Sequence, residues 1–272
     1  MPENLEEIEF TIFDTETTGL ELQSGDRVVE IAGLRFRGSE KIATFQSLVN
    51  PGRQISEAAF AVNRISQEML DSAPRIEEVM PKFLDFIGET ALLSYNAGFD
   101  MEFLNHELKL LRQPPLEKRM VLDILKMARR ALPDLERYAL WFVAQHLGLA
   151  PKQEHRALAD VELTFAVFNK LKSALVKKGL TDFTHFAGLF GLTSHFLENL
   201  RNQKIAAIQE AIDLWVKLKI KYISNSGAIT EREVSPKEIR HENKYHYLVG
   251  YCALRKDERT FRIDGILHLE IL

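Results

Sequence analysis

The first 50 residues contain three apolar stretches whose length and punctuation are typical of β-strands. Residues 10–16 form the first stretch, which runs directly into acidic side chains. Residues 27–36 and 41–50 form the other two, and the turn residues Gly38 and Ser39 between them favour a hairpin. We therefore expect one strand followed by a pair of antiparallel strands.

Farther along the chain, apolar residues recur at helical spacing and alternate with short buried strands. The helix expected over residues 56–70 begins at Ser56, a good N-cap, and the helix over 74–88 stops at Gly88. Strands first and strand–helix alternation afterwards predict an α/β domain with a mixed sheet, ending near residue 175. The other elements expected in this domain are helices over residues 98–112, 135–147 and 156–172 and strands over residues 91–96 and 120–125.

The pattern changes after this α/β domain. Residues 179–196 contain four phenylalanines, so we expect a linker that packs against the protein rather than one that floats in solvent. A helix is expected over residues 199–215, and residues 216–223 alternate between apolar side chains and lysines. Short strands at turn-punctuated intervals then predict a small β-barrel. These strands are expected over residues 228–234, 245–254, 259–264 and 266–272.

The composition is that of a soluble globular protein long enough for two domains. The 272 residues are 46% hydrophobic and 27% charged. No apolar run approaches the roughly 18 residues that a membrane span needs, and the acidic N-terminal segment lacks the layout of a signal peptide. The single Cys252 excludes an internal disulfide and fits a reducing compartment, so we expect a cytoplasmic protein.

Charge is unevenly divided along the chain. Residues 1–200 carry 22 basic and 29 acidic side chains, a net charge of −7, whereas residues 201–272 carry 13 and 10, a net charge of +3. An acidic body joined to a mildly basic C-terminal part indicates divided roles. The overall net charge of −4 argues against non-specific binding to a polyanion.

Two carboxylates end the first apolar strand. Asp14 and Glu16 project to the same side of it, because side chains alternate along a strand. Each negative charge makes ionisation of the other less favourable, and divalent cations held between them would remove that conflict. A single such pair is weak evidence, since this composition gives roughly five or six acid-x-acid pairs by chance. Its position at a strand end, before a glycine-containing turn, is typical of ligand sites in α/β sheets.

Two further acids and one histidine have related settings, each with an ordinary structural alternative. Asp100 lies in the first turn of an expected helix, where an acid also simply favours the helix dipole. Asp160 lies at the edge of an apolar helix face and could be a solvated helical acid. His155, five residues earlier, could be a surface residue, or a base that takes a proton from a water molecule near neutral pH.

Three segments together resemble the motifs of the DEDDh family of 3′→5′ exonucleases, which includes the exonuclease domain of the DNA polymerase III epsilon subunit. They are "FDTETTGL", "YNAGFDMEFL" and "HRALADVELT", and the resemblance covers roughly residues 8–175. The spacing of His155 and Asp160 matches the branch that uses histidine. The resemblance implies a ribonuclease H-like fold, a mixed sheet flanked by helices, and hydrolysis at the 3′ end of single-stranded nucleic acid.

Carried over by motif, the catalytic set is Asp14, Glu16, Asp100, Asp160 and the general base His155. Asp14, Glu16 and Asp160 would hold two divalent ions, Mg²⁺ or Mn²⁺, which stabilise both the entering and the leaving oxygen of a phosphodiester. Backbone amides around Thr15 to Leu20 would hold the terminal nucleotide. The residues expected to contact nucleic acid in this domain are Thr15, Thr17, Leu20, Asn96 and Phe99. This chain departs from many relatives, which have histidine in place of Tyr95 and near Asn63.

The C-terminal segment over residues 220–266 resembles a WYL domain, a small SH3/Sm-like β-barrel of bacterial regulators and nuclease-associated proteins. The tripeptide that names the family is His246-Tyr247-Leu248 here, with histidine in place of tryptophan. Arg259 and Arg262 match basic positions of the family and are expected to contact nucleic acid, whereas Gly265 replaces a further arginine. The ordinary alternative is that the tyrosines of this segment are alternating strand residues that pack a core.

Together these features predict three parts: an exonuclease domain over residues 1–178, a docked linker over 179–198 and a WYL-like domain over 199–272. The expected function is a metal-dependent 3′→5′ exonuclease on single strands, DNA favoured, whose C-terminal domain senses nucleic acid or another ligand. Expected partners are a DNA or RNA 3′ end and DNA repair or replication proteins, with no membrane. The alternatives are a non-catalytic nucleic-acid-binding regulator and a proofreading accessory subunit of a polymerase.

Overall fold

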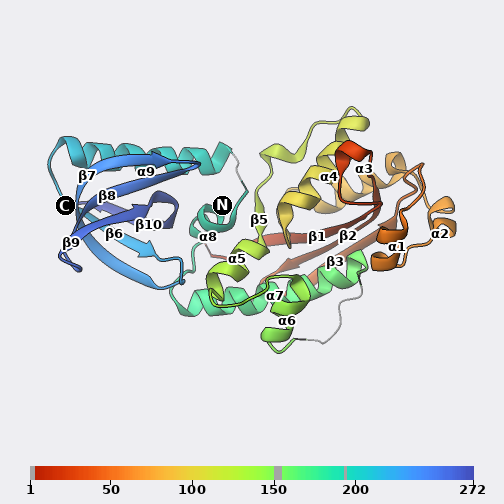
Figure 1. The fold of residues 1–272 in the computed structure, drawn as a ribbon, viewed down its shortest axis with the longest axis horizontal. Helices are drawn as coiled ribbons and strands as arrows, with labels where there is room; N and C mark the ends of the chain where they lie inside the picture. The colour runs from red at the N-terminus through yellow and green to blue at the C-terminus, as the bar shows by residue number, and fades with distance from the viewer. Residues whose placement is uncertain (1–3, 150–154, 193–194) are drawn as a thin grey trace.

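The structure is a computed structural model that describes residues 4–149, 155–192 and 195–272. Its N-terminal part is built on a five-stranded mixed sheet, as expected from the sequence, and the order of the strands is β3-β2-β1-β4-β5 (Figure 1). The strands β1, β2 and β3 pair antiparallel, whereas β4 and β5 run parallel to β1. The bounds are β1 Glu9–Thr17, β2 Val28–Arg37, β3 Glu40–Leu48, β4 Ala91–Ser94 and β5 Val121–Asp123.

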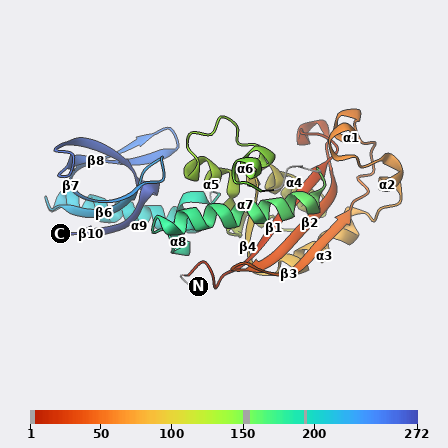
Figure 2. The ribbon, with the colours of Figure 1, turned by 90° about the horizontal axis from the view of Figure 1, so that it is seen from below.

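Helices cover both faces of this sheet because side chains alternate along β1. Ile12 packs into the cluster that contains α5, α6 and α7, whereas Phe13 packs into the opposite cluster with α3 and α4. The long helix α7 lies along one face, as Figure 2 shows. The helices beside the sheet are α3 Ile76–Ile87, α4 Ala97–Leu110, α5 Ile124–Ala131, α6 Leu140–His146 and α7 Ala157–Lys177.

Two helical predictions were wrong in detail. The single helix expected over residues 56–70 is two short helices, α1 Glu57–Asn63 and α2 Gln67–Asp71. The break comes at Arg64, whose φ of 58° is left-handed, and Ser66 then caps the second helix by accepting from the Met69 N–H. The helix expected over 135–147 is only Leu140–His146.

The helix α5 was not expected at all. The apolar stretch over residues 120–125 divides between the short strand β5 and the first turn of α5. Asp123 makes the division, because its side chain accepts hydrogen bonds from the N–H groups of Leu125 and Lys126 at 2.9 and 3.4 Å. The short apolar run therefore forms both the last strand of the sheet, β5, and the first turn of helix α5.

The segment expected as a linker contains helix α8 (Phe183–Phe190). Asp182 caps it by accepting from the His185 N–H at 3.0 Å. Phe183, Phe186 and Phe190 are buried in the cluster that also contains α7, and the side chain of Phe196 lies outside the described residues. This segment is therefore packed against the sheet domain, and the division of the chain at 178 and 198 stays a prediction.

The C-terminal part combines helix α9 (His195–Asp213) with an antiparallel five-stranded sheet of order β10-β6-β7-β8-β9 (Figure 1). Ile208 and Ala211 of α9 pack on this sheet. In the described residues β9 and β10 are the two edges and no pairing closes them, so the sheet is open. The strands are β6 Leu218–Ile223, β7 Ile229–Glu242, β8 Tyr245–Cys252, β9 Asp257–Arg262 and β10 Ile266–Ile271.

The two parts are joined by packing as well as by the chain. Ile223 and Leu267 of the C-terminal part are buried in the core cluster of the first domain. Gly227, with φ of 73°, sits against the carbonyl oxygen of Arg130, and a Cβ there would lie 3.0 Å from that atom. Among the described helices, none has the length and apolar character that crossing a membrane requires.

Candidate active site

An acidic cluster lies where β1 meets the start of α7. Carboxylate oxygens of Asp14, Glu16 and Asp160 all lie within 4.8 Å of one another. Asp14 and Glu16 share one side of β1, and Asp160 lies in the first turn of α7, more than 140 residues farther along the chain. The fold thus brings three of the four predicted acids to one point.

Asp100 lies behind this cluster and is held by three hydrogen bonds. Its Oδ1 accepts from the N–H and hydroxyl of Thr15 at 3.0 and 2.7 Å, and its Oδ2 accepts from the Ser94 hydroxyl at 2.6 Å. The side chain comes from the first turn of α4, which begins directly after β4. Asp100 is only 3% exposed, and its contacts join β1, β4 and α4.

The acids of the site are buried close to one another, so the ionised form of each is unfavourable. Burial raises the pKa of Asp14 well above its usual range, and repulsion from Asp100, Glu16 and Asp160 raises it further. Burial and the neighbouring acids raise the pKa of Glu16 to about 8. Burial also raises the pKa of Asp100 to about 6, against its three hydrogen bonds. A nearby cation would favour the ionised form of every one of these groups.

The donor set fits a divalent metal ion. Asp14, Glu16 and Asp160 offer only carboxylate oxygens, the hard ligands that Mg²⁺ and Mn²⁺ prefer. The raised pKa values mark repulsion that a bound cation would relieve. These three residues could therefore hold the ions that the sequence predicted.

Glu30 is a buried acid beside the cluster that the sequence did not reveal. It is fully buried on β2 opposite Glu16, and it accepts from Arg156 Nε and Nη2 at 3.1 and 2.8 Å. It also accepts from the Ala157 N–H at 3.0 Å and from Gln46 Nε2 at 2.8 Å. Burial raises its pKa, but these hydrogen bonds outweigh burial and leave the pKa below the usual value. Glu30 thus fixes the start of α7, one turn before Asp160.

Asn63 also belongs to the site. It is buried at the end of α1, hydrogen-bonds the Glu16 side chain and thereby opposes the rise in the Glu16 pKa. Its Oδ1 accepts from the Ile65 N–H at 3.1 Å, which fixes the orientation of the amide. The one available signal was its place in the stretch where related exonucleases carry histidine.

His155 lies directly before α7, with φ of 50°, and its half-buried side chain is not part of the three-residue cluster. The residues before it, 150–154, lie outside the described part of the chain. Its neighbour Arg156 is the residue that Glu30 anchors. The role of His155 as a base stays a prediction.

The turn after β1 is largely committed to internal hydrogen bonds. The Thr15 N–H and hydroxyl hold Asp100, and the Thr18 N–H donates to the Arg27 carbonyl at 2.9 Å. Thr17 is buried, and its hydroxyl donates to the Gly19 carbonyl at 2.5 Å. The N–H groups of Thr15 and Thr18 are thus occupied by internal hydrogen bonds in this structure, and the contact of this segment with a nucleotide stays a prediction.

The remaining residues expected to contact nucleic acid are more accessible. Leu20 is 79% exposed, and Asn96 is exposed in a left-handed conformation at the start of α4. The half-buried ring of Phe99 packs on Phe103 at 4.8 Å between ring centres. These contacts stay predictions.

Arg259 and Arg262, the two C-terminal arginines expected to contact nucleic acid, are not part of the acidic cluster. Arg259 is exposed on β9 near Asp257, at 3.9 Å. Arg262 is half-buried and lies over the ring of Tyr245 at 4.7 Å. A Cβ at Gly265 would lie 2.8 Å from Tyr222 Cε2 and 3.0 Å from the Ile223 carbonyl oxygen, so a side chain there would require these neighbours to shift.

Comparison with known families decides the relationship. Residues 11–168 match the family described as exonuclease, and residues 203–271 match the WYL domain. The chain belongs to the exonuclease family. The resemblance predicted from the three motifs and from the C-terminal segment is thus confirmed, and the enzyme class is that of nucleases, which are hydrolases.

Curated relatives share the exonuclease part. A DNA polymerase III subunit epsilon from Treponema pallidum (strain Nichols) is 39% identical over 168 residues, 61% of this chain and 77% of that protein. A DNA polymerase III PolC-type from Thermotoga maritima is 36% identical over 172 residues, 63% of this chain. The exonuclease chain spans only 12% of that second relative.

Solved structures show the same fold. Exonuclease X in complex with 5′ overhanging duplex DNA is 28% identical, with a TM-score of 0.50, covering 63% of this chain and 94% of that chain. The zinc-bound E. coli ExoI–ssDNA complex has a TM-score of 0.60 at 16% identity and covers 97% of this chain and 64% of that chain. At 16% identity the second likeness concerns the fold alone, and it extends over both parts of the exonuclease chain.

Proposed function

We propose that the chain is a metal-dependent 3′→5′ exonuclease that removes nucleotides from the 3′ end of single-stranded nucleic acid. The observation that carries this proposal is the acidic cluster, in which oxygens of Asp14, Glu16 and Asp160 lie within 4.8 Å. The Exonuclease X complex with DNA and the relatives named DNA polymerase III support DNA as the favoured substrate.

Each residue of the site has a defined task in this reaction. Asp14, Glu16 and Asp160 hold two divalent ions, Mg²⁺ or Mn²⁺, which when bound stabilise negative charge on the reacting phosphate oxygens. Asp100 fixes β1 against α4 through Thr15 and Ser94. His155 accepts a proton from the attacking water as that water's oxygen bonds to phosphorus and the bond to the 3′ oxygen breaks.

The C-terminal part has the second task, to hold or sense the single strand or another ligand. Its sheet, which is open in the described residues, represents the SH3/Sm-like fold predicted for residues 199–272. Residues 179–198 dock this part on the exonuclease domain of residues 1–178. The buried free Cys252 agrees with a cytoplasmic location.

The test is hydrolysis of an end-labelled single strand by purified chain. We expect stepwise shortening from the 3′ end with Mg²⁺ or Mn²⁺, none with chelator, and a loss of about a thousandfold or more in Asp14→Ala. The control is Asp134→Ala, which removes an exposed acid outside the cluster. Degradation that survives Asp14→Ala would exclude the proposed site. A matched DNA and RNA panel then gives the substrate preference.

A second candidate, a proofreading accessory subunit of a polymerase, is favoured by the match to the epsilon subunit of Treponema pallidum. In that case the chain binds a replicative polymerase and removes mismatched 3′ ends faster than matched ones. Equal rates on matched and mismatched primer ends, with no polymerase retained by the chain, would exclude this role.

A further inference from the structure

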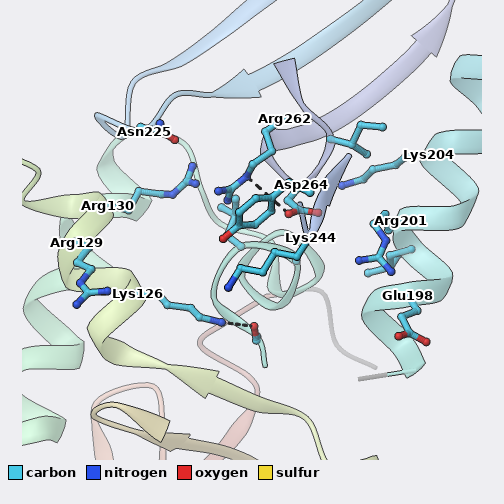
Figure 3. Close-up of a pocket in the computed structure, with 16 residues that line it drawn as sticks. Lys126, Arg129, Arg130, Glu198, Arg201, Lys204, Asn225, Lys244, Arg262 and Asp264 are labelled. Atoms are coloured by element: carbon cyan, nitrogen blue, oxygen red, sulfur yellow. Dashed lines mark hydrogen bonds and ion pairs between the residues drawn. The ribbon is translucent and has the colours of Figure 1, made fainter. Parts of the chain in front are cut away.

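A cavity lies between the two parts of the chain, and none of the residues that line it belongs to the acidic cluster. Its volume is about 760 Å³, and its walls come from α5, the end of α8, α9 and the strands β8 and β9 (Figure 3). Because Ile223 and Leu267 bury themselves in the first domain, these walls are fixed relative to one another. The cavity is therefore a formed feature of the whole chain rather than a gap between mobile domains.

The walls of this cavity are strongly basic. Seven basic side chains line it, against only two acidic ones, Glu198 and Asp264. The exonuclease domain contributes Lys126, Arg129 and Arg130, all from α5, and the other four come from the C-terminal part. This excess contrasts with the net acidic charge of the domain that supplies α5.

Most of these cations lack a carboxylate partner. Lys126 Nζ donates to the Gly191 carbonyl at 3.0 Å, and Lys204 Nζ donates to the Ile266 carbonyl at 2.6 Å. Within the described part of the chain, Arg262 is the one cation of the cavity with a carboxylate within 4.0 Å, that of Asp264 at 3.7 Å. Backbone carbonyls thus hold the basic groups in place without neutralising them.

One polar atom of the cavity wall has no partner. The Nε atom of Arg201 on α9 is buried and makes no hydrogen bond to any described residue. Arg201 faces the cavity from the α9 side, whereas Lys126 and Arg130 reach toward it from α5 (Figure 3). A buried guanidinium donor without an acceptor costs stability unless a ligand supplies the acceptor.

The basic groups also act on one another across the cavity. Burial lowers the pKa of Lys126, Asp123 raises it in part, and repulsion from Lys244 and Arg262 lowers it again. Burial and repulsion from Arg262 likewise lower the pKa of Arg130. Groups from both parts of the chain therefore share one region of unneutralised positive charge.

We propose that this cavity between the exonuclease and WYL parts binds nucleotide phosphate groups through Lys126 and Arg130 of α5 together with Arg201, Lys244 and Arg262. The excess of basic over acidic side chains in the cavity favours a ligand with more than one phosphate. The cavity volume is in the range of small-ligand sites. Planar guanidinium groups bind phosphate oxygens in pairs. The inference that the cavity binds phosphate does not depend on the proposed exonuclease function. Only the choice of nucleotides as the ligands rests on that function.

The cavity begins close to the catalytic edge of the sheet. Asp123, which caps α5, is in register with Ser94 on the neighbouring strand, and Ser94 donates to Asp100. Lys126 lies in the first turn of the same helix. The phosphates that bind in the cavity therefore belong either to a single strand that extends to the acidic cluster or to a free nucleotide. The experiment distinguishes the two ligands.

The test measures binding by the whole chain in chelator, where no hydrolysis takes place. The three probes are a labelled single-stranded hexanucleotide, a nucleoside diphosphate and inorganic pyrophosphate. The variant is Lys126→Gln with Lys244→Gln, two side chains that line the cavity and belong to no hydrophobic cluster, so their loss leaves the core intact. The control is Lys170→Gln with Arg255→Gln, two exposed cations outside the cavity, one from each part.

We expect the cavity variant to bind at least one probe about tenfold more weakly than the wild type, with a salt dependence smaller by about two counterions, and the control to stay within about twofold. Loss of hexanucleotide binding alone assigns the cavity to the strand. Loss of diphosphate or pyrophosphate binding assigns it to a free nucleotide.

The proposal is overturned if the wild type binds none of the three probes, or if the cavity variant and the control variant bind equally well. Circular dichroism of both variants checks that each is folded. Because the acidic cluster is intact in both, a chain without exonuclease activity that still binds in the cavity would contradict only the proposed function.

Discussion

Glu30 on β2 and Arg156 at the start of α7 form a two-point ion pair at the edge of the acidic cluster, with Nε and Nη2 at 3.1 and 2.8 Å from the Glu30 oxygens. The pair joins residues 126 positions apart in the chain. It gives the buried Glu30 carboxylate a cation of its own, and these hydrogen bonds hold the Glu30 pKa below its usual value against burial. The ionised Glu30 in turn adds to the repulsion that raises the pKa of Glu16. The pair also fixes the turn of α7 that carries Asp160.

Glu30→Gln should weaken both stability and activity. It leaves Arg156 without its carboxylate, so we expect a loss of about 2 kcal/mol in the free energy of unfolding. Because α7 then holds Asp160 less firmly, metal affinity and kcat/KM should fall about 10- to 100-fold. Urea unfolding and a metal titration of activity measure the two effects.

The matched control is Glu162→Gln on the same helix, an acid paired with Lys41 at the surface. It should change the free energy of unfolding by less than about 0.5 kcal/mol. Equal effects of the two substitutions would contradict the positioning role of Glu30.

Without metal, the protein should become less stable as pH rises from about 4.5 to about 8. The Glu16 pKa is about 8 in the folded protein and near its ordinary value of 4.5 in the unfolded chain. Between these values the folded state keeps a proton that the unfolded state has lost, so raising the pH lowers the free energy of unfolding. Thermal unfolding in chelator across this pH range measures the slope.

Saturating Mn²⁺ should remove that slope, and Glu16→Gln should raise the stability of the metal-free protein at pH 8 by about 1–2 kcal/mol, since the site remains partly open to solvent. A metal-free stability that is constant or rises over this pH range would contradict the electrostatics described for the cluster.

Asn63→Ala should move the acid limb of the pH–rate profile to higher pH. The Asn63 side chain hydrogen-bonds Glu16 and lowers its pKa, so its removal raises the pH at which Glu16 becomes a carboxylate. Loss of the Ile65 contact should also cost about 1 kcal/mol of stability. A pH–rate profile at subsaturating Mn²⁺, where Glu16 still titrates, measures the shift. A loss of activity without any shift would mean that Asn63 acts only through packing.

Gly227→Ala should weaken the packing of the C-terminal part against the exonuclease domain. The residue has φ of 73°, and a Cβ would lie 3.0 Å from the Arg130 carbonyl oxygen. Gly179→Ala is the matched control, with φ of 90° and open space around the added Cβ. Both substitutions strain the backbone by about 1 kcal/mol, and Gly227→Ala should cost about 1–2 kcal/mol more. Thermal unfolding and limited proteolysis between residues 190 and 217 would reveal the difference.

Helices and strands were predicted correctly where a single hydrophobic pattern ran through one whole element. The alternation over residues 216–223 and the apolar strand before Asp14 each gave the strand that was expected. The expectation failed where a local interaction overrode a continuous pattern. Asp123 converted half of an apolar run into α5, and left-handed Arg64 divided one expected helix into two. Such caps and turns depend on single side-chain hydrogen bonds, and the spacing of apolar residues along the chain carries no information about them.

By itself, the sequence determined the mixed α/β sheet, the identity of the four acids and the presence of two different parts, because apolar periodicity and motif spacing are local properties of the chain. Only the tertiary structure decided that Glu30 and Asn63 belong to the site, since each acts through a partner distant in sequence. The same holds for the basic cavity, where Lys126 and Lys244 are ordinary surface lysines until folding brings α5 against the C-terminal sheet. Electrostatic energy depends on distances in space, and the chain alone does not contain them.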